Sequence, residues 1–114
     1  MSVAVDPDRE VLAERIRTAL RGKAAIREVA MFGGLSFMVS GKITVAARKK
    51  GDLLVHVDAD RSEALLSRPG ARIAQMGTRR SMGPSWLEVD AKALKGDALA
   101  FWINTALDLN ARSS

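Results

Sequence analysis

The sequence predicts one α+β domain over residues 1–114, in which N-terminal, middle and C-terminal helices cover an antiparallel sheet of about five to six strands in two layers. Three observations support this prediction. Strand-like apolar runs follow one another through short glycine-containing turns, which join antiparallel neighbours. Apolar residues at helical spacing stand near both ends of the chain. A chain of 114 residues is also long enough to bury one core without disulfide support.

The first expected element is an amphipathic helix over residues 7–21. Asp6 and Pro7 are typical of a helix start, because an aspartate side chain accepts a backbone hydrogen bond and proline suits the first helical position. Gly22 is the expected C-terminal stop. The apolar face recurs at helical spacing in Val11, Leu12, Ile16, Ala19 and Leu20. This face is therefore expected to pack on the core.

A β-hairpin is expected next, preceded by a short strand near residues 26–31. Large or β-favouring apolar side chains precede the turn Ser40-Gly41-Lys42, and a second apolar run over residues 43–47 follows it. The pair Gly33-Gly34 lacks Cβ atoms, so it suits a bulge, a positive φ angle or the close approach of another backbone. One interpretation of this pair is a turn or bulge that closes the core. The other is a ligand-facing glycine loop.

A second polar turn, Lys49-Lys50-Gly51-Asp52, leads into an expected strand over residues 53–57. A short helix is expected over residues 58–66, where Asp60 and Glu63 have the spacing of a capping box. These segments would add one strand to the sheet and place a small helix in the middle of the chain.

Two further strands are expected over residues 71–76 and 85–89, separated by a polar loop over residues 77–84. Alternation along the second strand places Trp86 and Glu88 on one face. The opposite face receives Ser85, Leu87 and Val89. This strand is therefore expected to have one face in the core.

Asp97 is expected to cap the last helix. Its continuous apolar stripe comprises Leu99, Trp102, Ile103, Ala106 and Leu107. Trp102 is therefore expected to belong to the core or to a dimer contact. Residues 1–5 and 110–114 are expected to fray.

Few of the groups that carry catalysis or bind metals are present. The chain has no cysteine, which excludes disulfides and thiolate metal sites, and His56 is the only histidine. No Gly-x-Ser-x-Gly elbow or P-loop occurs, and the carboxylates show no acid/base spacing. We therefore expect no enzyme activity, no catalytic residue, no metal and no cofactor. His56, within an apolar strand, is expected to be a packed or edge residue.

The apolar runs and the N-terminus predict a cytoplasmic protein with no membrane partner. No run approaches the roughly 18 apolar residues of a membrane helix. The first six residues lack both the basic start and the apolar core of a signal peptide. The absence of cysteine also fits a reducing compartment.

Two basic segments point to an anionic partner. The net charge of +5 favours contact with nucleic acid or acidic proteins, although it also serves solubility. Adjacent arginines in the loop and the basic turn after residue 47 would hold phosphates, and a nearby indole would stack a base. Alternatively, both segments are solvated and the indole packs beside the core. The candidate nucleic-acid-binding or partner-binding residues are Arg48, Lys49, Lys50, Arg79, Arg80 and Trp86.

Four segments have the order and spacing of one protein family. They are Met31-Phe32-Gly33-Gly34-Leu35-Ser36-Phe37-Met38 followed by Gly41-Lys42, then Leu53-Leu54-Val55-His56-Val57-Asp58, then Met82-Gly83-Pro84-Ser85-Trp86-Leu87-Glu88-Val89, and finally Leu99–Leu107 with its tryptophan. In these segments the chain resembles the TfoX/Sxy N-terminal domain. The resemblance extends from about Val29 to Leu107, which is most of the chain.

That resemblance implies an antiparallel sheet covered by helices and a link to the regulation of competence for DNA uptake. The two-domain namesakes act as transcriptional co-activators beside a cyclic-AMP receptor protein and carry a second, C-terminal helical domain. The present sequence stops at Ser114, so a stand-alone N-terminal domain is expected, which need not share the co-activator role. A distant similarity to YjbR-type domains, which have the same sheet-and-helix pattern, keeps nucleic-acid binding open.

Two kinds of function follow from these expectations. The first is a non-enzymatic regulatory or binding module that acts on transcription or competence through DNA or a DNA-bound regulator. The second is a protein–protein interaction or dimerisation domain without nucleic-acid binding, in which a homodimer would form through a sheet edge or the apolar helices. The two differ in whether the arginine loop and the Lys49-Lys50 turn form one contiguous positive face.

Overall fold

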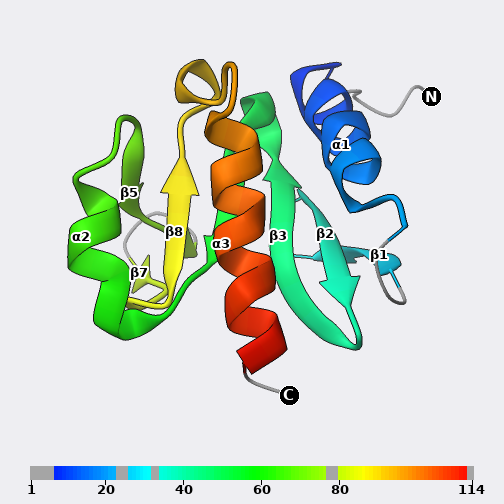
Figure 1. Cartoon of the computed structure of the whole chain (residues 1–114). Coiled ribbons are helices and arrows are strands. Elements are labelled where there is room, and N and C mark those ends of the chain that lie inside the picture. The colour runs from blue at the N-terminus through cyan, green and yellow to red at the C-terminus, as the bar shows by residue number, and fades with distance from the viewer. Residues whose placement is uncertain (1–6, 23–25, 32–33, 77–79, 113–114) are drawn as a thin grey trace.

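The computed structural model describes residues 7–22, 26–31, 34–76 and 80–112 (Figure 1). The helices are α1 (Pro7–Leu20), α2 (Ser62–Leu66) and α3 (Ala98–Arg112), with short 3-10 turns η1 (Lys49–Gly51), η2 (Ala59–Arg61) and η3 (Ala91–Ala93). The strands are β1 (Ile26–Met31), β2 (Gly34–Val39), β3 (Lys42–Arg48), β4 (Leu53–His56), β5 (Ala71–Ile73), β6 (Gln75–Met76), β7 (Arg80–Ser81) and β8 (Trp86–Val89).

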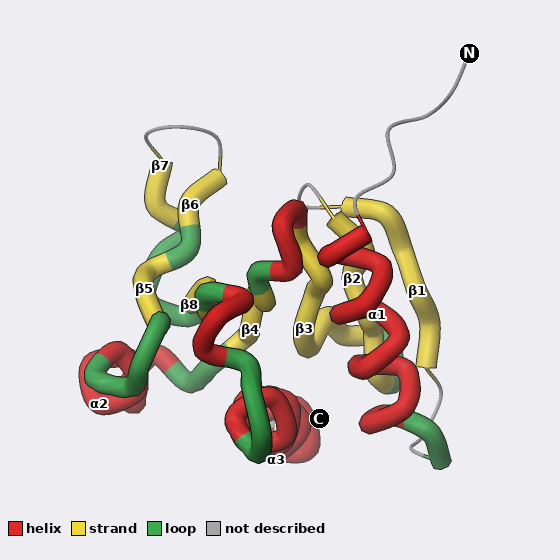
Figure 2. Tube along the Cα trace, turned by 90° about the horizontal axis from the view of Figure 1, so that it is seen from above, coloured by secondary structure: helices red, strands yellow, loops and turns green. Residues whose placement is uncertain are grey.

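Six of the strands form one antiparallel sheet in the order β1-β2-β3-β4-β8-β5. The three helices lie on one side of this sheet, and the separate β6–β7 pair projects from the other side (Figure 2). The predicted two-layer α+β fold is confirmed. None of the helices in the described ranges is long and apolar enough to span a membrane.

Helix α1 begins and ends close to the predicted positions. Its buried residues are Leu12, Ala13, Ile16 and Leu20, which face the core at helical spacing. Gly22 has a φ angle of +85°, the left-handed conformation that commonly ends a helix. The predicted cap Asp6 and the ends 1–5 and 113–114 lie outside the described residues.

Strands β2 and β3 form the predicted hairpin. Ser40 and Gly41 both have positive φ angles, +53° and +83°, and Val39 pairs with Lys42 across them. A two-residue connection with positive φ at both positions matches the right-handed twist of the strands it joins. The turn therefore fixes the register of the hairpin.

Gly34 begins β2 and lies directly against the backbone of β3. A Cβ atom at Gly34 would overlap with the carbonyl oxygen of Ala47 and lie 3.0 Å from the Cα atom of Arg48. The absence of a side chain thus allows two strands to pack closely, in agreement with the structural interpretation of this glycine. Gly33 lies outside the described residues.

The main core lies between the sheet and the helices. Alternate strand residues contribute Phe37, Val39, Val45, Ala47, Leu53, Val55, Leu87 and Val89, and α3 contributes Leu99, Trp102, Ile103 and Ala106. Trp102 is 1 % exposed, so of its two predicted roles the structure supports the core. On the opposite face, Met82 and Trp86 pack on a small cluster of Ala46, Leu54 and Ala74.

The middle helix begins differently from the prediction. Asp58, not Asp60, provides the side-chain cap, because its Oδ1 atom accepts the backbone N–H of Asp60 at 2.9 Å. The short turn η2 therefore comes before α2, and Arg61 precedes α2 without a side-chain cap. The predicted capping box between Asp60 and Glu63 was wrong because the 3-10 turn uses the earlier aspartate.

The expected strand over residues 71–76 is broken at Ala74. The N–H of Ala74 donates to the carbonyl of Trp86, and its own carbonyl accepts the N–H of Met82. The chain then leaves the main sheet as β6, which pairs with β7 inside the region expected to be a loop. The prediction of a loop at Arg80 and Ser81 was wrong because β7 lacks the apolar alternation by which a strand is recognised in sequence.

Helix α3 continues to Arg112, beyond the point where fraying was expected. Asn110 donates from its side-chain nitrogen to the carbonyl of Val39 at 3.2 Å. Arg112 lies 3.8 Å from Asp58 and 3.6 Å from Asp108. These contacts of the polar side chains Asn110 and Arg112 stabilise the last turn of α3.

Candidate binding site at the basic end of the sheet

Two basic 3-10 turns lie at the same end of the sheet. Strands β3 and β8 both pair antiparallel with β4, which lies between them, so β3 and β8 run in the same direction. Their ends therefore reach the same edge, where η1 follows β3 and η3 follows β8 (Figure 1). We call this edge the basic end of the sheet; its lysines are Lys49, Lys50, Lys92 and Lys95.

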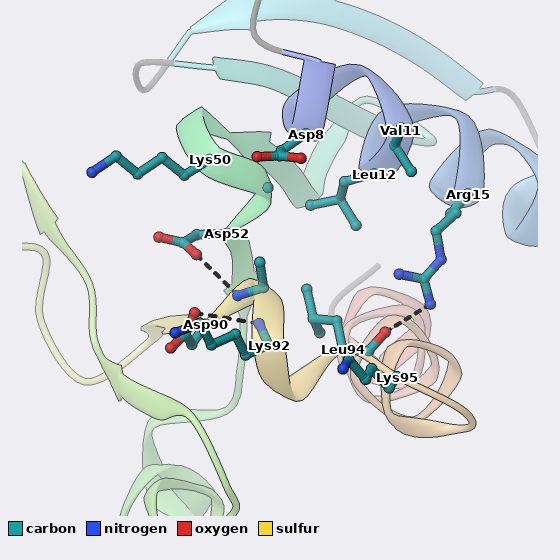
Figure 3. A pocket seen from close by; sticks show the side chains of 12 residues that line it. Asp8, Val11, Leu12, Arg15, Lys50, Asp52, Asp90, Lys92, Leu94 and Lys95 are labelled. Carbon is teal, nitrogen blue, oxygen red and sulfur yellow. Dashed lines mark hydrogen bonds between the residues drawn. The ribbon is translucent and has the colours of Figure 1, made fainter.

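A groove opens at the basic end between α1, η1 and residues 90–95 (Figure 3). Its volume is about 510 Å³. Leu12 and Leu94, which are almost fully buried, form its apolar floor, whereas Val11 on its wall is 61 % exposed. We refer to this feature as the α1–η3 groove.

Close packing of α1 on η1 forms one side of the α1–η3 groove. Gly51 is buried with a φ angle of +81°, and a Cβ atom there would lie 3.2 Å from the carbonyl oxygen of Asp8. On the other side, the Nη2 atom of Arg15 donates to the carbonyl of Leu94 at 2.7 Å. Helix α1 therefore contacts both η1 and the segment that contains Leu94.

The carboxylates beside η3 hold the fold together. The Oδ1 atom of Asp52 accepts the N–H of Ala91 at 3.0 Å, and its Oδ2 atom accepts a hydrogen bond from Arg72 at 3.1 Å. The Oδ1 atom of Asp90 accepts the N–H of Lys92 at 3.3 Å, which caps η3. These acids are therefore already engaged by backbone and arginine donors.

Arg48, a candidate phosphate-binding residue, lies in an ion-pair network on the sheet face opposite the helices. Its Nη1 atom is 3.5 Å from Glu88, and its Nη2 atom donates to the carbonyl of Gln75 at 3.3 Å. Glu88 also accepts from Arg72 at 3.1 Å, and Arg72 reaches Asp52. The Arg48 side chain is only 15 % exposed, so much of its charge is balanced within the protein.

The other candidate residues do not form one cluster. Arg80 is exposed on β7, in the hairpin that lies on the outer face of the sheet (Figure 2). Lys49 and Lys50 instead lie at the basic end of the sheet. Arg48 lies between the two regions through its contact with the hairpin. Arg79 lies outside the described residues. The structure instead brings Lys50 into one groove with Arg15, Lys92 and Lys95.

Trp86 stacks on His56, with ring centroids 4.5 Å apart and an interplanar angle of 24°. Trp86 is half-buried and packs on the small outer cluster, so its ring already has a stacking partner. His56 is half-buried as well, in agreement with the prediction of a packed residue. Among the described residues, no group of three or more His, Asp or Glu side chains is placed to hold a metal ion.

The burial of His56 predicts a specific pH dependence of stability. Loss of hydration lowers the pKa of His56 below its ordinary value of 6.5, so the unfolded chain takes up the proton first as the pH falls. Stability should therefore fall as the pH drops through about 6.5 towards the lower pKa of the folded state. Thermal melts of the wild type and His56→Gln between about pH 8 and pH 5 measure this effect. Identical pH profiles for the two chains would contradict it.

Comparison with protein families matches the chain to one family model. The match is to the TfoX N-terminal domain and covers residues 18–109. The chain belongs to this family. Comparison with curated proteins and with solved structures gives no match.

The match to the TfoX N-terminal domain confirms the family inferred from the Met-Phe-Gly-Gly segment and the three segments that follow it. Gly34 gives a physical reason for one glycine of that segment in this TfoX N-terminal domain, because the backbone of β3 occupies the space of a side chain. The matched range includes β1 to β8 and most of α3.

Three cations of the groove were missed by reasoning from the sequence, namely Arg15, Lys92 and Lys95. Each stands in a helix or a segment of mixed composition without an adjacent basic residue, so none forms a basic run. One available signal was that η1 and η3 each follow a strand directly. Placing both at one edge also requires the strand order, which local sequence does not contain.

Proposed function

We propose that this TfoX N-terminal domain is a non-enzymatic regulatory module that binds DNA phosphates through the basic end of its sheet. The observation that carries the proposal is the convergence of four lysines on one edge from two segments far apart in sequence, residues 49–50 and residues 92–95. Lysine ammonium groups bind phosphates as point charges without reading sequence. The neighbouring Asp52 is paired with Arg72, so it offsets this charge less than a free carboxylate would.

The likeness to competence regulators supports a role in transcription, and it is consistent with a module that positions itself on the DNA backbone. Sequence readout would then come from a DNA-bound partner protein. Trp86 contributes little to this mode of binding, because its ring is stacked on His56. The surface we assign is therefore the end of the sheet and not its outer face.

The salt dependence of DNA binding tests the proposal. Each phosphate contact contributes about −0.9 to the slope of log K against log salt. We expect Lys49→Gln/Lys50→Gln to reduce the slope by about 2, because two contacts are lost. Fluorescence anisotropy of a labelled duplex over a salt series gives the slope. Arg21→Gln/Lys42→Gln removes the same net charge from exposed residues away from the basic end and should leave most of the slope in place.

A second charge-matched variant separates the two sequence-based surfaces. If Arg79→Gln/Arg80→Gln reduces the slope and Lys49→Gln/Lys50→Gln does not, the DNA surface is the β6–β7 hairpin and our assignment is wrong. If neither the wild type nor any variant binds DNA even at low salt, DNA binding itself is excluded.

The alternative function is protein–protein interaction, and one observation favours a specific surface for it. Strand β1 is an edge strand of six residues, and Ile26 at its start is 37 % exposed. An edge of this length presents backbone donors and acceptors for pairing with another chain. If this TfoX N-terminal domain does not bind DNA, the next test is whether strand β1 pairs with a strand of another chain.

A further inference from the structure

The α1–η3 groove combines an apolar floor with an exposed apolar wall. Leu12 and Leu94 are 3 % and 1 % exposed, and Val11 stands above them at 61 %. Figure 3 shows Val11 and Leu12 on the side of α1 that faces Leu94. An exposed valine over buried leucines is apolar surface that a ligand would remove from water.

The acids around the groove lie together at one end. Asp8, Asp52 and Asp90 lie there with Lys50 and Lys92, whereas Arg15 and Lys95 lie at the opposite end, away from the lining acids (Figure 3). Within the described ranges, neither Arg15 nor Lys95 forms an ion pair. Arg15 uses one Nη atom to donate to Leu94, which leaves further guanidinium donors at the same place. This end of the groove is therefore the part that favours an anion.

The size and shape of the groove favour a small molecule over a polymer. A volume of about 510 Å³ lies within the range of small-molecule sites. The hydrogen bond from Arg15 to the carbonyl of Leu94 joins the two walls at the cationic end. A peptide that ran through the groove would have to cross this bond, whereas a compact ligand would end against it.

We propose that the α1–η3 groove binds a small organic anion with an apolar body, whose charged group contacts Arg15 and Lys95 and whose body covers Val11, Leu12 and Leu94. The chemical class is a carboxylate, sulfonate or phosphate ester attached to an aliphatic or aromatic group. The site does not depend on DNA binding. A ligand held there would sit on the same end of the sheet as the proposed phosphate contacts.

Two fluorescent probes of matched shape test this proposal. Anilinonaphthalene sulfonate has an apolar body and one negative charge, and phenylnaphthylamine has the same ring system without the charge. We expect the wild type to bind the sulfonate saturably at one site. Arg15→Gln/Lys95→Gln should weaken the sulfonate at least about tenfold and the neutral probe less than about twofold. Equal affinity of the wild type and this variant for the sulfonate would overturn the proposal.

A control variant and two single changes make the test specific. Arg21→Gln/Lys49→Gln removes the same charge, with Lys49 at the basic end but outside the groove lining, and should leave sulfonate binding within about twofold. Because Arg15 also donates to Leu94, Lys95→Gln and Val11→Asp, both at exposed side chains, repeat the test without loss of that bond. Each should weaken the sulfonate at least about threefold. If Arg21→Gln/Lys49→Gln weakens it as much, binding follows net charge and the groove is not the site.

The probe titration and the DNA titration fail independently. Lys50 enters only the DNA test, and Arg15 enters only the probe test. A chain that binds the sulfonate at the groove but no DNA would support this inference and contradict the proposed function. A chain that binds DNA but not the sulfonate would support the proposed function and contradict this inference.

Discussion

Replacement of Gly34 by alanine should lower the free energy of unfolding by about 3 kcal/mol. The added methyl group would overlap with the carbonyl oxygen of Ala47, and backbone atoms cannot move aside as the end of a flexible side chain can. Relief requires β2 and β3 to separate at the point where their pairing begins. Urea denaturation followed by circular dichroism measures the loss.

Gly41→Ala is the matched control for this prediction. Gly41 lies at the other end of the same hairpin, and a Cβ atom there would meet nothing within 4 Å. Its φ angle of +83° makes alanine unfavourable by about 1 kcal/mol, a conformational cost without a collision. Equal losses for Gly34→Ala and Gly41→Ala would show that conformation, and not the contact with Ala47, makes Gly34 necessary.

Replacement of Trp102 by alanine should cost about 4 kcal/mol. Trp102 is 1 % exposed and meets the ring of Phe101 edge-on, with centroids 5.3 Å apart and an interplanar angle of 82°. Its indole fills the space between α3 and the sheet, so truncation leaves a cavity that surrounding side chains refill only in part. Denaturation followed by circular dichroism measures the loss without reliance on tryptophan fluorescence.

Trp86→Ala provides the comparison on the opposite face of the sheet. Trp86 is half-buried and its neighbours are His56 and a cluster of only three buried residues. We expect its removal to cost about 1–2 kcal/mol, well below the cost at Trp102. If Trp86→Ala is the more destabilising change, the outer cluster carries more of the stability than its size implies.

The elements that sequence predicts well here are those whose signals are local. Apolar spacing in α1 and α3 and the turn at Ser40 and Gly41 lie within single segments, so each could be placed without knowledge of the rest of the fold. The break at Ala74 could not be placed in this way. It depends on hydrogen bonds to Trp86 and Met82, which lie outside the segment itself.

The same distinction applies to the candidate site. Adjacent charges such as Lys49 and Lys50 can be recognised as a run in the sequence. Arg15 and Lys95 line one groove only because α1 and residues 90–95 are packed at the same end of the sheet. For Arg48 the basic run predicted phosphate binding, or alternatively a solvated charge. In the structure Glu88, from a strand distant in sequence, pairs with it. Strand order decides both outcomes.

The position of β8 in the sheet has a consequence for synthesis of the chain on the ribosome. Strands β1 to β3 each pair with the next strand in sequence, so the β1–β4 meander can form its hydrogen bonds as it emerges. Strand β5 emerges before β8 but pairs only with β8. Until Trp86–Val89 has been translated, β5 has no strand to pair with, and one edge of β4 remains unpaired. Strand β8 is therefore the element that joins the β1–β4 meander to β5.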